Sequence, residues 1–143
     1  MPADSLDRAR QVQDAAARLG FDWPEIDGAW DKLHEEIGEL QAAASDAERR
    51  EELGDLLFML VNLSRHLGVN PQAALAQATA KFERRFAHVQ AGMRAQGRPM
   101  EAAELDAMEA LWQAAKRLER RGEPGYRSAS GQAQGTGPQG DDQ

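Results

Sequence analysis

Apolar side chains recur at steps of three and four residues along most of this chain, and this period limits the fold more than any other feature. Such steps place side chains on one face of an α-helix. Alanine and leucine fill most of the apolar positions, β-branched residues are scarce, and glycine and proline stand mostly between the periodic segments. The sequence therefore predicts an all-α fold, a bundle of helices.

Five segments carry the helical period. We expect helices at about residues 4–19, 26–44, 47–67, 70–93 and 101–121. Gly20 and Gly68 are predicted to end the first and third helices, Asp46 to cap the start of the third, and Asn70 to cap the fourth. The third helix contains an almost wholly apolar stretch, residues 56–63, which is typical of a helix that is buried from several sides.

Residues 1–121 are expected to form one domain, because 143 residues are too few for two ordinary ones. Residues 122–143 are rich in Gly, Ser and Gln, which predicts a disordered tail. The net charge of −7 disfavours a nucleic acid polymer as partner. No apolar run approaches the roughly 20 residues that span a membrane. The first ten residues lack a signal-peptide pattern, so the cytoplasm is the expected location.

Two acidic signatures on the second and third predicted helices carry the clearest chemical signal. Glu36 and Glu39 are three residues apart, as are Glu52 and Asp55, so the members of each pair share a helix face. The turn near Ser45 lies about equally far from both pairs, so two antiparallel helices would bring the four carboxylates to one level. Such a cluster repels itself unless a cation compensates it, and oxygen ligands suit Mg²⁺ or Mn²⁺.

A solvated acidic surface is the other interpretation of these pairs, because acidic residues three apart on a helix usually face water. The apolar stripes beside both pairs favour a metal site, and so do Gly38 and Gly54 within the signatures. A glycine inside a helix costs about 1 kcal/mol relative to alanine, which the close approach of a helix or ligand would explain. No histidine follows a glutamate by three residues, as in di-iron bundles. The chain also has no cysteine, which leaves the chemistry of hard cations on phosphates.

Basic and aromatic side chains that suit a phosphate or a base follow later in the chain. Three basic residues lie on the fourth predicted helix, where a solvated basic face is the favoured explanation for isolated residues: Lys81, Arg84 and Arg85. Trp112, with Lys116 one turn away, is either a core residue or a platform for stacking a base. Asn62 lies in the apolar stretch of the third helix, where an amide needs partners. It is either a structural hydrogen-bonding group or a ligand contact.

Taken together, these motifs resemble the MazG family of nucleoside triphosphate pyrophosphohydrolases, and above all the C-terminal half of its two-domain bacterial members. The resemblance covers roughly residues 6–118, in a chain expected to hold one such domain. It is carried by six stretches: residues 20–23, 32–39, 51–58, 61–68, 81–86 and 111–116.

The resemblance implies an all-α pyrophosphohydrolase bundle whose core is completed in a homodimer. It also implies that Mg²⁺, or Mn²⁺ in its place, is held by Glu36, Glu39, Glu52 and Asp55, with Glu35 at a further acidic position. The positions that match phosphate or nucleotide contacts are seven: Lys32, Asn62, Lys81, Arg84, Arg85, Trp112 and Lys116.

The reaction implied by the resemblance is the cleavage of a nucleoside triphosphate, ribo or deoxy, into the monophosphate and pyrophosphate, which would clear unwanted nucleotides from the pool. Glu35 or Glu39 would accept the proton of the attacking water. A narrower substrate of the same fold stays open: dUTP, an oxidised nucleotide or phosphoribosyl-ATP. A non-catalytic helical interaction module with an acidic face is the alternative from another class.

Overall fold

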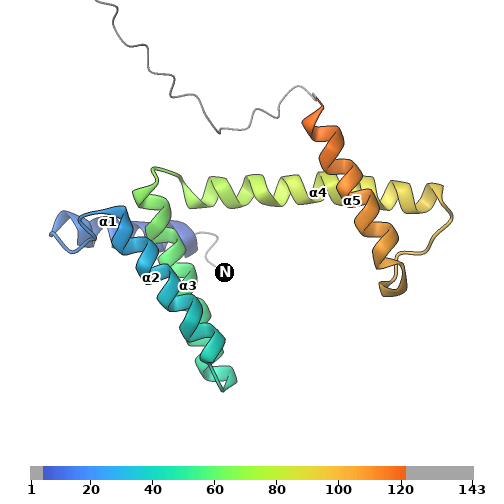
Figure 1. Ribbon diagram of the computed structural model, residues 1–143. Coiled ribbons are helices and arrows are strands. Elements are labelled where there is room, and N and C mark those ends of the chain that lie inside the picture. Colours follow the sequence, from blue (N-terminus) through green and yellow to red (C-terminus); the bar gives the residue numbers. More distant parts are fainter. Residues whose placement is uncertain (1–4, 122–143) are drawn as a thin grey trace, which may run out of the picture. The chain divides into compact units, whose positions relative to one another are not determined.

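The computed structural model describes residues 5–121, and its regular elements in that range are helices (Figure 1). These are α1 (Ser5–Arg18), α2 (Ile26–Ala42), α3 (Asp46–His66), α4 (Pro71–Ala95), the short 3₁₀ helix η1 (Ala102–Glu104) and α5 (Leu105–Arg120). The prediction of an all-α fold is confirmed. The predicted disordered tail, residues 122–143, lies outside the described residues.

Glycines end three of the helices in the same way. Gly20, Gly68 and Gly97 have φ values of +88°, +69° and +65°, in the left-handed region that a Cβ disfavours. After the first of them, the N–H of Phe21 donates to the carbonyl of Ala16 at 3.0 Å, which is the long bond of a Schellman motif. The equivalent bond recurs after the other two glycines. The predicted helix ends at Gly20 and Gly68 are confirmed.

Side chains cap the starts of α3 and α4. The hydroxyl of Ser45 accepts from the N–H of Glu48 at 3.2 Å, and Ser45 has the extended backbone that a cap requires. The predicted cap at Asp46 is wrong by one residue, because Asp46 is already helical. The amide oxygen of Asn70 accepts from the N–H of Ala73 at 3.1 Å, as its predicted role as a cap requires.

The first of two compact units covers residues 1–81, of which residues 5–81 are described. Its helices α2 and α3 lie side by side and are joined by a short turn, and α1 packs against α3 (Figure 1). The buried core residues come from α2 and α3: Ala29, Leu33, Met59 and Leu63. Ile26 and Leu56 are partly buried and pack against this core.

The second unit covers residues 82–143, of which residues 82–121 are described. It holds the later part of α4, η1 and α5. Its buried apolar side chains are Val89, Met93 and Ala115. A Cβ on Gly92 would lie only 2.5 Å from the side chain of Leu111, so α4 and α5 approach each other closely at that point.

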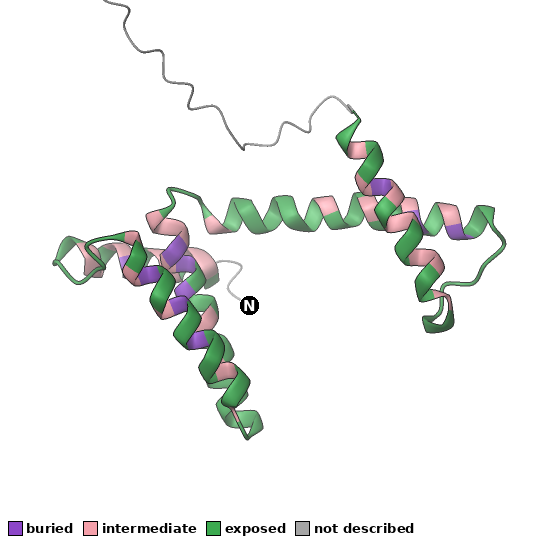
Figure 2. Cartoon of the chain, viewed as in Figure 1, coloured by how far each residue is buried: buried purple, intermediate pink, exposed green. Residues whose placement is uncertain are grey.

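Several apolar residues that the sequence predicts to be buried are exposed, and much of α2 and α3 has the colour of exposed residues in Figure 2. Leu53, Leu57 and Leu60 form one stripe on α3 and expose 47%, 50% and 44% of their surface. Trp30 on α2 is also exposed. Since α1 and α2 do not cover this stripe, the expectation that α3 is buried from several sides is not met within residues 5–81. None of the described helices is both long and apolar enough to cross a membrane.

Candidate functional site

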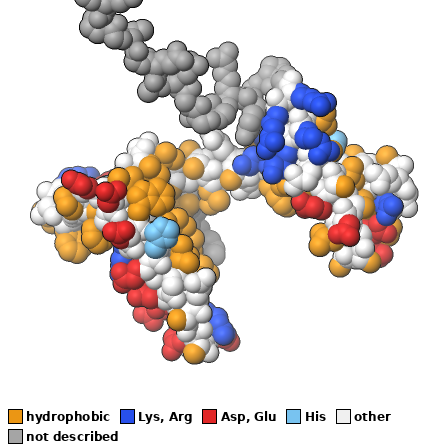
Figure 3. Space-filling model, in the orientation of Figure 1, with side chains coloured by type: hydrophobic (Ala, Val, Ile, Leu, Met, Phe, Trp, Pro, Cys, Tyr) orange, Lys and Arg blue, Asp and Glu red, His pale blue; other side chains and the backbone are white. Residues whose placement is uncertain are grey.

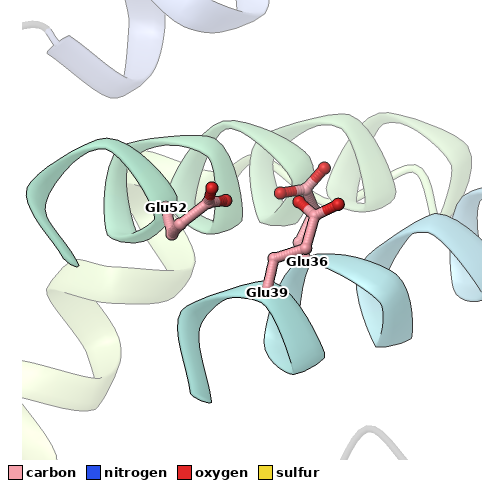
Figure 4. A group of neighbouring side chains, drawn as sticks. All are labelled: Glu36, Glu39 and Glu52. Atoms are coloured by element: carbon pink, nitrogen blue, oxygen red, sulfur yellow. The ribbon is translucent and has the colours of Figure 1, made fainter. Parts of the chain in front are cut away.

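Three of the four predicted metal ligands meet between α2 and α3. Glu36 and Glu39 project from α2, Glu52 projects from α3, and their side chains point toward one another (Figure 4). One carboxylate oxygen from each lies within 4.8 Å of the other two. Glu36 is buried, Glu52 is partly buried and Glu39 is exposed, so the cluster is open to solvent on one side.

Asp55, the fourth predicted ligand, is not part of this cluster. It is exposed and lies three residues after Glu52, on the same face of α3. Its role as a ligand stays a prediction.

Two oxygens of the cluster are buried and have no hydrogen-bond partner among the described residues: Glu36 Oε2 and Glu52 Oε2. Buried polar atoms are nearly always paired, and leaving one unpaired costs about 1–3 kcal/mol. A hard divalent cation would satisfy both oxygens and cancel the repulsion between the carboxylates. The donor set therefore fits such a cation.

Lys32 acts as a counter-ion inside the cluster. Its Nζ lies 3.1 Å from Glu35 Oε1 and 3.1 Å from Glu36 Oε1. These bonds, first that to Glu35 and then that to Glu36, raise the pKa of Lys32 above its ordinary value. Lys32 is therefore charged at neutral pH and is held on the acidic cluster, and Glu35 is paired with it.

The neighbouring carboxylates change the pKa of Glu39. Repulsion from Glu36 raises the pKa of Glu39, and burial and the charge of Glu52 raise it further. A carboxylate with a raised pKa accepts a proton more readily at neutral pH. This shift belongs to the protein without a bound cation, and the role of Glu39 as a proton acceptor stays a prediction.

The glycines within the two acidic signatures lie in open space. Apart from the adjoining backbone of the same helix, no described atom lies within 4 Å of the position that a Cβ on Gly38 or Gly54 would take. Among residues 5–81, no other helix makes the close approach to these glycines that the sequence predicts as one of two explanations. The approach of a ligand, the other explanation, stays a prediction.

A second polar cluster ties α1 and the connector at residues 19–25 to α3. The guanidinium of Arg65 donates to Asp14 Oδ1 at 2.8 Å, to Asp22 Oδ2 at 3.1 Å and to Asn62 Oδ1 at 2.7 Å. Burial raises the pKa of Asp22, but hydrogen bonds, led by that from Arg65, bring this pKa below its ordinary value. Arg65 thus fixes both the connector and the amide of Asn62.

A pocket of about 320 Å³ opens beside this cluster, between α1, the connector and α3. Most of its wall is apolar, and Phe21, Trp23 and Phe58 contribute aromatic rings. Asn62 also lines it, so this predicted ligand contact faces a cavity and also serves as a structural hydrogen-bonding group.

In the second unit, Trp112 lies in a cluster of aromatic and basic side chains. Its ring centroid is 5.4 Å from that of Phe82, and the guanidinium carbon of Arg85 lies 5.6 Å from it. Arg85 donates to Glu119 Oε2 from Nε at 3.0 Å and from Nη2 at 2.8 Å. Basic side chains gather over the end of α5 (Figure 3). Arg84 is the more exposed of the two arginines, 4.0 Å from Glu119.

Lys81 and Lys116 are partly buried on α4 and α5, and their roles as phosphate contacts stay predictions. Sequence reasoning assigned no role to five residues that organise these clusters: Gln13, Asp14, Asp22, Arg65 and Glu119. The signals available for two of them were weak. Arg65 is a charge at the end of an apolar run, and Glu119 lies seven residues after Trp112, on the same face of α5.

Residues 28–90, which cover most of α2, all of α3 and most of α4, match the family model described as the MazG nucleotide pyrophosphohydrolase domain. A stretch of 120 residues is 44% identical to the nucleoside triphosphate pyrophosphohydrolase of Escherichia coli, and covers 80% of this chain and 46% of that protein. A stretch of 112 residues is 40% identical to the nucleoside triphosphate pyrophosphohydrolase/pyrophosphatase MazG of Thermotoga maritima, and covers 78% of this chain and 44% of that protein.

An uncharacterized protein of Bacillus subtilis, YabN, is 39% identical over 70 residues, which are 49% of this chain and 14% of that protein. The chain therefore spans less than half the length of each of these relatives. The segment matched by the family model contains the whole acidic cluster as well as Asn62 and Arg65. With that match, and with identities of 40% and 44% over about four fifths of its length, the chain belongs to the MazG family.

Proposed function

We propose that this chain hydrolyses nucleoside triphosphates to monophosphates and pyrophosphate, with Mg²⁺ or Mn²⁺ at the acidic cluster. The observation that carries the proposal is the meeting of Glu36, Glu39 and Glu52, with two buried oxygens left unpaired within the described part of the chain. The names of the Escherichia coli and Thermotoga relatives support this class of reaction. Asp55, one turn further along α3, is proposed as the fourth ligand.

Each carboxylate has a proposed task. Glu36 and Glu52 would hold the cation with their unpaired oxygens. A bound divalent cation supplies charge neutralisation at phosphate oxygens and lowers the pKa of a bound water. Glu39, on the exposed side of the cluster, would accept the proton of the attacking water, in addition to its place among the ligands. Glu35 is the second candidate for this base, although its pairing with Lys32 makes it less available.

The basic and aromatic residues are proposed to bind the nucleotide. Lys32 stands at the acidic cluster, and Arg84, Lys81 and Lys116 are proposed to neutralise phosphate charge. Arg85 is engaged by Glu119 and lies over Trp112. This arrangement favours Arg85 as the residue that orients the Trp112 ring.

The test is pyrophosphate release by the full chain with Mg²⁺ and, separately, with Mn²⁺. Glu36→Gln and Glu52→Gln should each lower the rate on the order of a hundredfold, because each removes a charged ligand oxygen. Glu51→Gln is the matched control, since Glu51 neighbours Glu52 in sequence but is exposed and outside the cluster. Ligand variants that release pyrophosphate as fast as the wild type would show that the site is wrong.

The same assay also ranks the proposed substrates. Ordinary ribo- and deoxynucleoside triphosphates should be cleaved if the protein clears unwanted nucleotides broadly. Cleavage confined to dUTP, to an oxidised nucleotide or to phosphoribosyl-ATP would assign the narrower function. No cleavage of any of these, with no effect of Mg²⁺ on the melting temperature, would identify the chain as a non-catalytic helical module.

We also propose that two copies of the chain form a homodimer. The supporting observation is the exposed stripe of Leu53, Leu57 and Leu60 on α3. Exposed apolar groups gathered into one patch mark interaction surfaces more often than scattered ones do. Packing a second copy on this stripe would give α3 the cover that residues 5–81 do not supply.

A further inference from the structure

A charged pair between α4 and α5 is shielded from water, although the aromatic ring beside it is half exposed. The side chains of Arg85 and Glu119 expose only 11% and 16% of their surface, whereas Phe82 is exposed. Glu119 Oε2 accepts two hydrogen bonds from Arg85, one from Nε at 3.0 Å and one from Nη2 at 2.8 Å. Hydrogen bonds between charged groups are strong, and shielding from water strengthens them further.

Arg85 connects this carboxylate to the ring of Trp112. Its guanidinium carbon lies 5.6 Å from the ring centroid, within the distance of about 6 Å at which an aromatic face attracts a cation. Trp112 and Glu119 are seven residues apart, on one face of α5, whereas Arg85 belongs to α4. One guanidinium therefore contacts both ends of a two-turn stretch of α5.

The bonds to Glu119 determine where Arg85 lies. A single contact with a partly exposed ring is too weak to offset the rotamer entropy that a fixed arginine loses. Two charge-assisted hydrogen bonds to a shielded carboxylate are stronger than that contact. Glu119 is therefore the residue that holds Arg85 against Trp112.

Arg84, the next residue on α4, does not take part in this arrangement. Its side chain is 60% exposed, and its Nη2 lies 4.0 Å from Glu119 Oε1, which is too far for a hydrogen bond. Neighbouring residues of a helix point about 100° apart, so Arg84 faces solvent while Arg85 faces α5. The two arginines thus have different surroundings, and the bonds to Glu119 distinguish them.

We propose that Glu119 is a positioning residue for nucleotide binding, because it holds Arg85 against Trp112 and so keeps the Trp112 ring in one orientation. Glu119 acts through Arg85 and does not contact the nucleotide itself. The inference rests on the proposed function in taking Trp112 as a contact of the nucleotide. The dependence of the ring on Glu119 is measurable without any nucleotide.

The first measurement follows the indole N–H signal of Trp112 in the ¹⁵N-labelled full chain, free of nucleotide. The chain has three tryptophans, and a Trp112→Phe variant assigns the signal. Glu119→Ala should shift it, because Arg85 leaves the ring. Glu119→Gln should shift it less, because the amide oxygen still accepts from Arg85. Glu83→Gln, at an exposed residue of α4, should not shift it. An unmoved signal in Glu119→Ala would overturn the proposal.

The second measurement is pyrophosphate release from UTP. Glu119→Ala should raise KM about tenfold, as expected for the loss of one well-placed contact, and should leave kcat unchanged. Val89→Ala weakens the packing of the same unit at a buried position and should change neither value. An equal rise in KM for Val89→Ala would mean that Glu119 only joins the two helices, and would overturn its positioning role.

A double-mutant cycle shows whether Glu119 acts through Arg85. Arg85→Ala should raise KM at least as much as Glu119→Ala does. The double variant should raise it no further than Arg85→Ala, because the second change then has no contact left to remove. Two effects that multiply in the double variant would show that Glu119 acts independently of Arg85, which contradicts the proposal.

The role of Glu119 and the proposed reaction fail separately. α,β-Methylene-UTP, which resists cleavage between its α- and β-phosphates, gives dissociation constants with Mg²⁺ present and without hydrolysis. If Glu119→Ala weakens its binding about tenfold while UTP is not cleaved, the role of Glu119 stands and the proposed reaction fails. If UTP is cleaved with the same KM by Glu119→Ala and the wild type, the reaction stands and the role of Glu119 fails. A wild-type protein that does not bind the analogue would overturn both.

Discussion

The carboxylate of Glu39 is repelled by the other carboxylates of the acidic cluster. Its pKa is raised, first by Glu36, so its ionised form is disfavoured by the fold. As the pH rises through this pKa, ionisation of Glu39 therefore reduces the stability of the metal-free protein. A bound cation would reverse this effect, because it turns the repulsion into shared attraction.

Glu39→Gln should therefore raise the melting temperature of the metal-free protein at pH 7 and reduce the further rise caused by Mg²⁺. Thermal unfolding with a chelator, and then with added Mg²⁺, measures both effects. Glu51→Gln, outside the cluster, should change neither. A Glu39→Gln protein that is less stable without metal would show that repulsion does not dominate at this position.

Asp22 has the opposite dependence on pH. Its folded-state pKa lies below the ordinary value of 3.8 despite the opposing effect of burial, because of the hydrogen bonds led by that from Arg65. The stabilisation is complete above pH 3.8 and is lost as the pH falls through the lower folded-state pKa. Asp22→Asn should lower the free energy of unfolding at pH 7 by about 1–3 kcal/mol.

Urea unfolding at pH 7, 5 and 3 checks this prediction, since the gap between wild type and Asp22→Asn should narrow at the lowest pH. Asp31→Asn changes an exposed aspartate on α2 and should have no such dependence. If the difference in unfolding free energy between the two proteins stayed constant down to pH 3, the charge of Asp22 would not be its cause.

At the scale of helices, local rules predicted the helix ends well and the burial less well. Gly20 and Asn70 were identifiable because a left-handed glycine and a side-chain cap depend on a few neighbouring residues. The exposure of Trp30 and Leu57 could not be predicted locally, because burial depends on which other element, or which other chain, covers a helix face.

The candidate site likewise has contacts that local sequence patterns predict and contacts that they do not. The meeting of Glu36 with Glu52 followed from their spacing about a short turn. The bonds of Arg65 to Asp14 and Asp22 span 51 and 43 residues, and no local pattern encodes such pairs. The engagement of Arg85 by Glu119 was missed for the same reason, because it depends on how α4 packs against α5.

The contact between α4 and α5 in the second unit depends on a glycine. A Cβ at Gly92 would lie 2.5 Å from Leu111 Cδ2 and 2.8 Å from its Cδ1. Gly92→Val should destabilise the protein by about 1–3 kcal/mol, because the Leu111 side chain must leave its place. Urea unfolding measures the loss, and a further change of Leu111 to Ala should recover part of it. No loss would mean that the two helices separate freely there.

A side chain added at Gly54 in α3 should instead stabilise the protein. Its Cβ position is open in the described chain, so Gly54→Ala should gain about 1 kcal/mol from helix propensity. The same unfolding assay shows the gain as a higher urea midpoint. A lower midpoint would instead mean that a second copy of the chain packs against this glycine.

For the whole molecule, the exposed stripe on α3 gives the clearest prediction. The full chain should sediment as a dimer, and Leu57→Asp should shift it to a monomer, because a carboxylate cannot be buried in an apolar interface without a partner. Leu19→Asp changes a side chain that is already 89% exposed and should leave the dimer intact. A wild-type protein that sediments as a monomer at all concentrations would contradict the proposed assembly.

The three glycines that end α1, α3 and α4 have a consequence in genetic terms. Every single-base missense change in a glycine codon introduces a residue with a Cβ, and a left-handed backbone then costs roughly 1–2 kcal/mol. Gly20, Gly68 and Gly97 are therefore positions where almost any such mutation is felt. At most surface positions of the helices, a substitution changes the free energy of unfolding by no more than about 0.5 kcal/mol. A random mutant library selected for folded protein should retain these three codons more strictly than those of their helical neighbours.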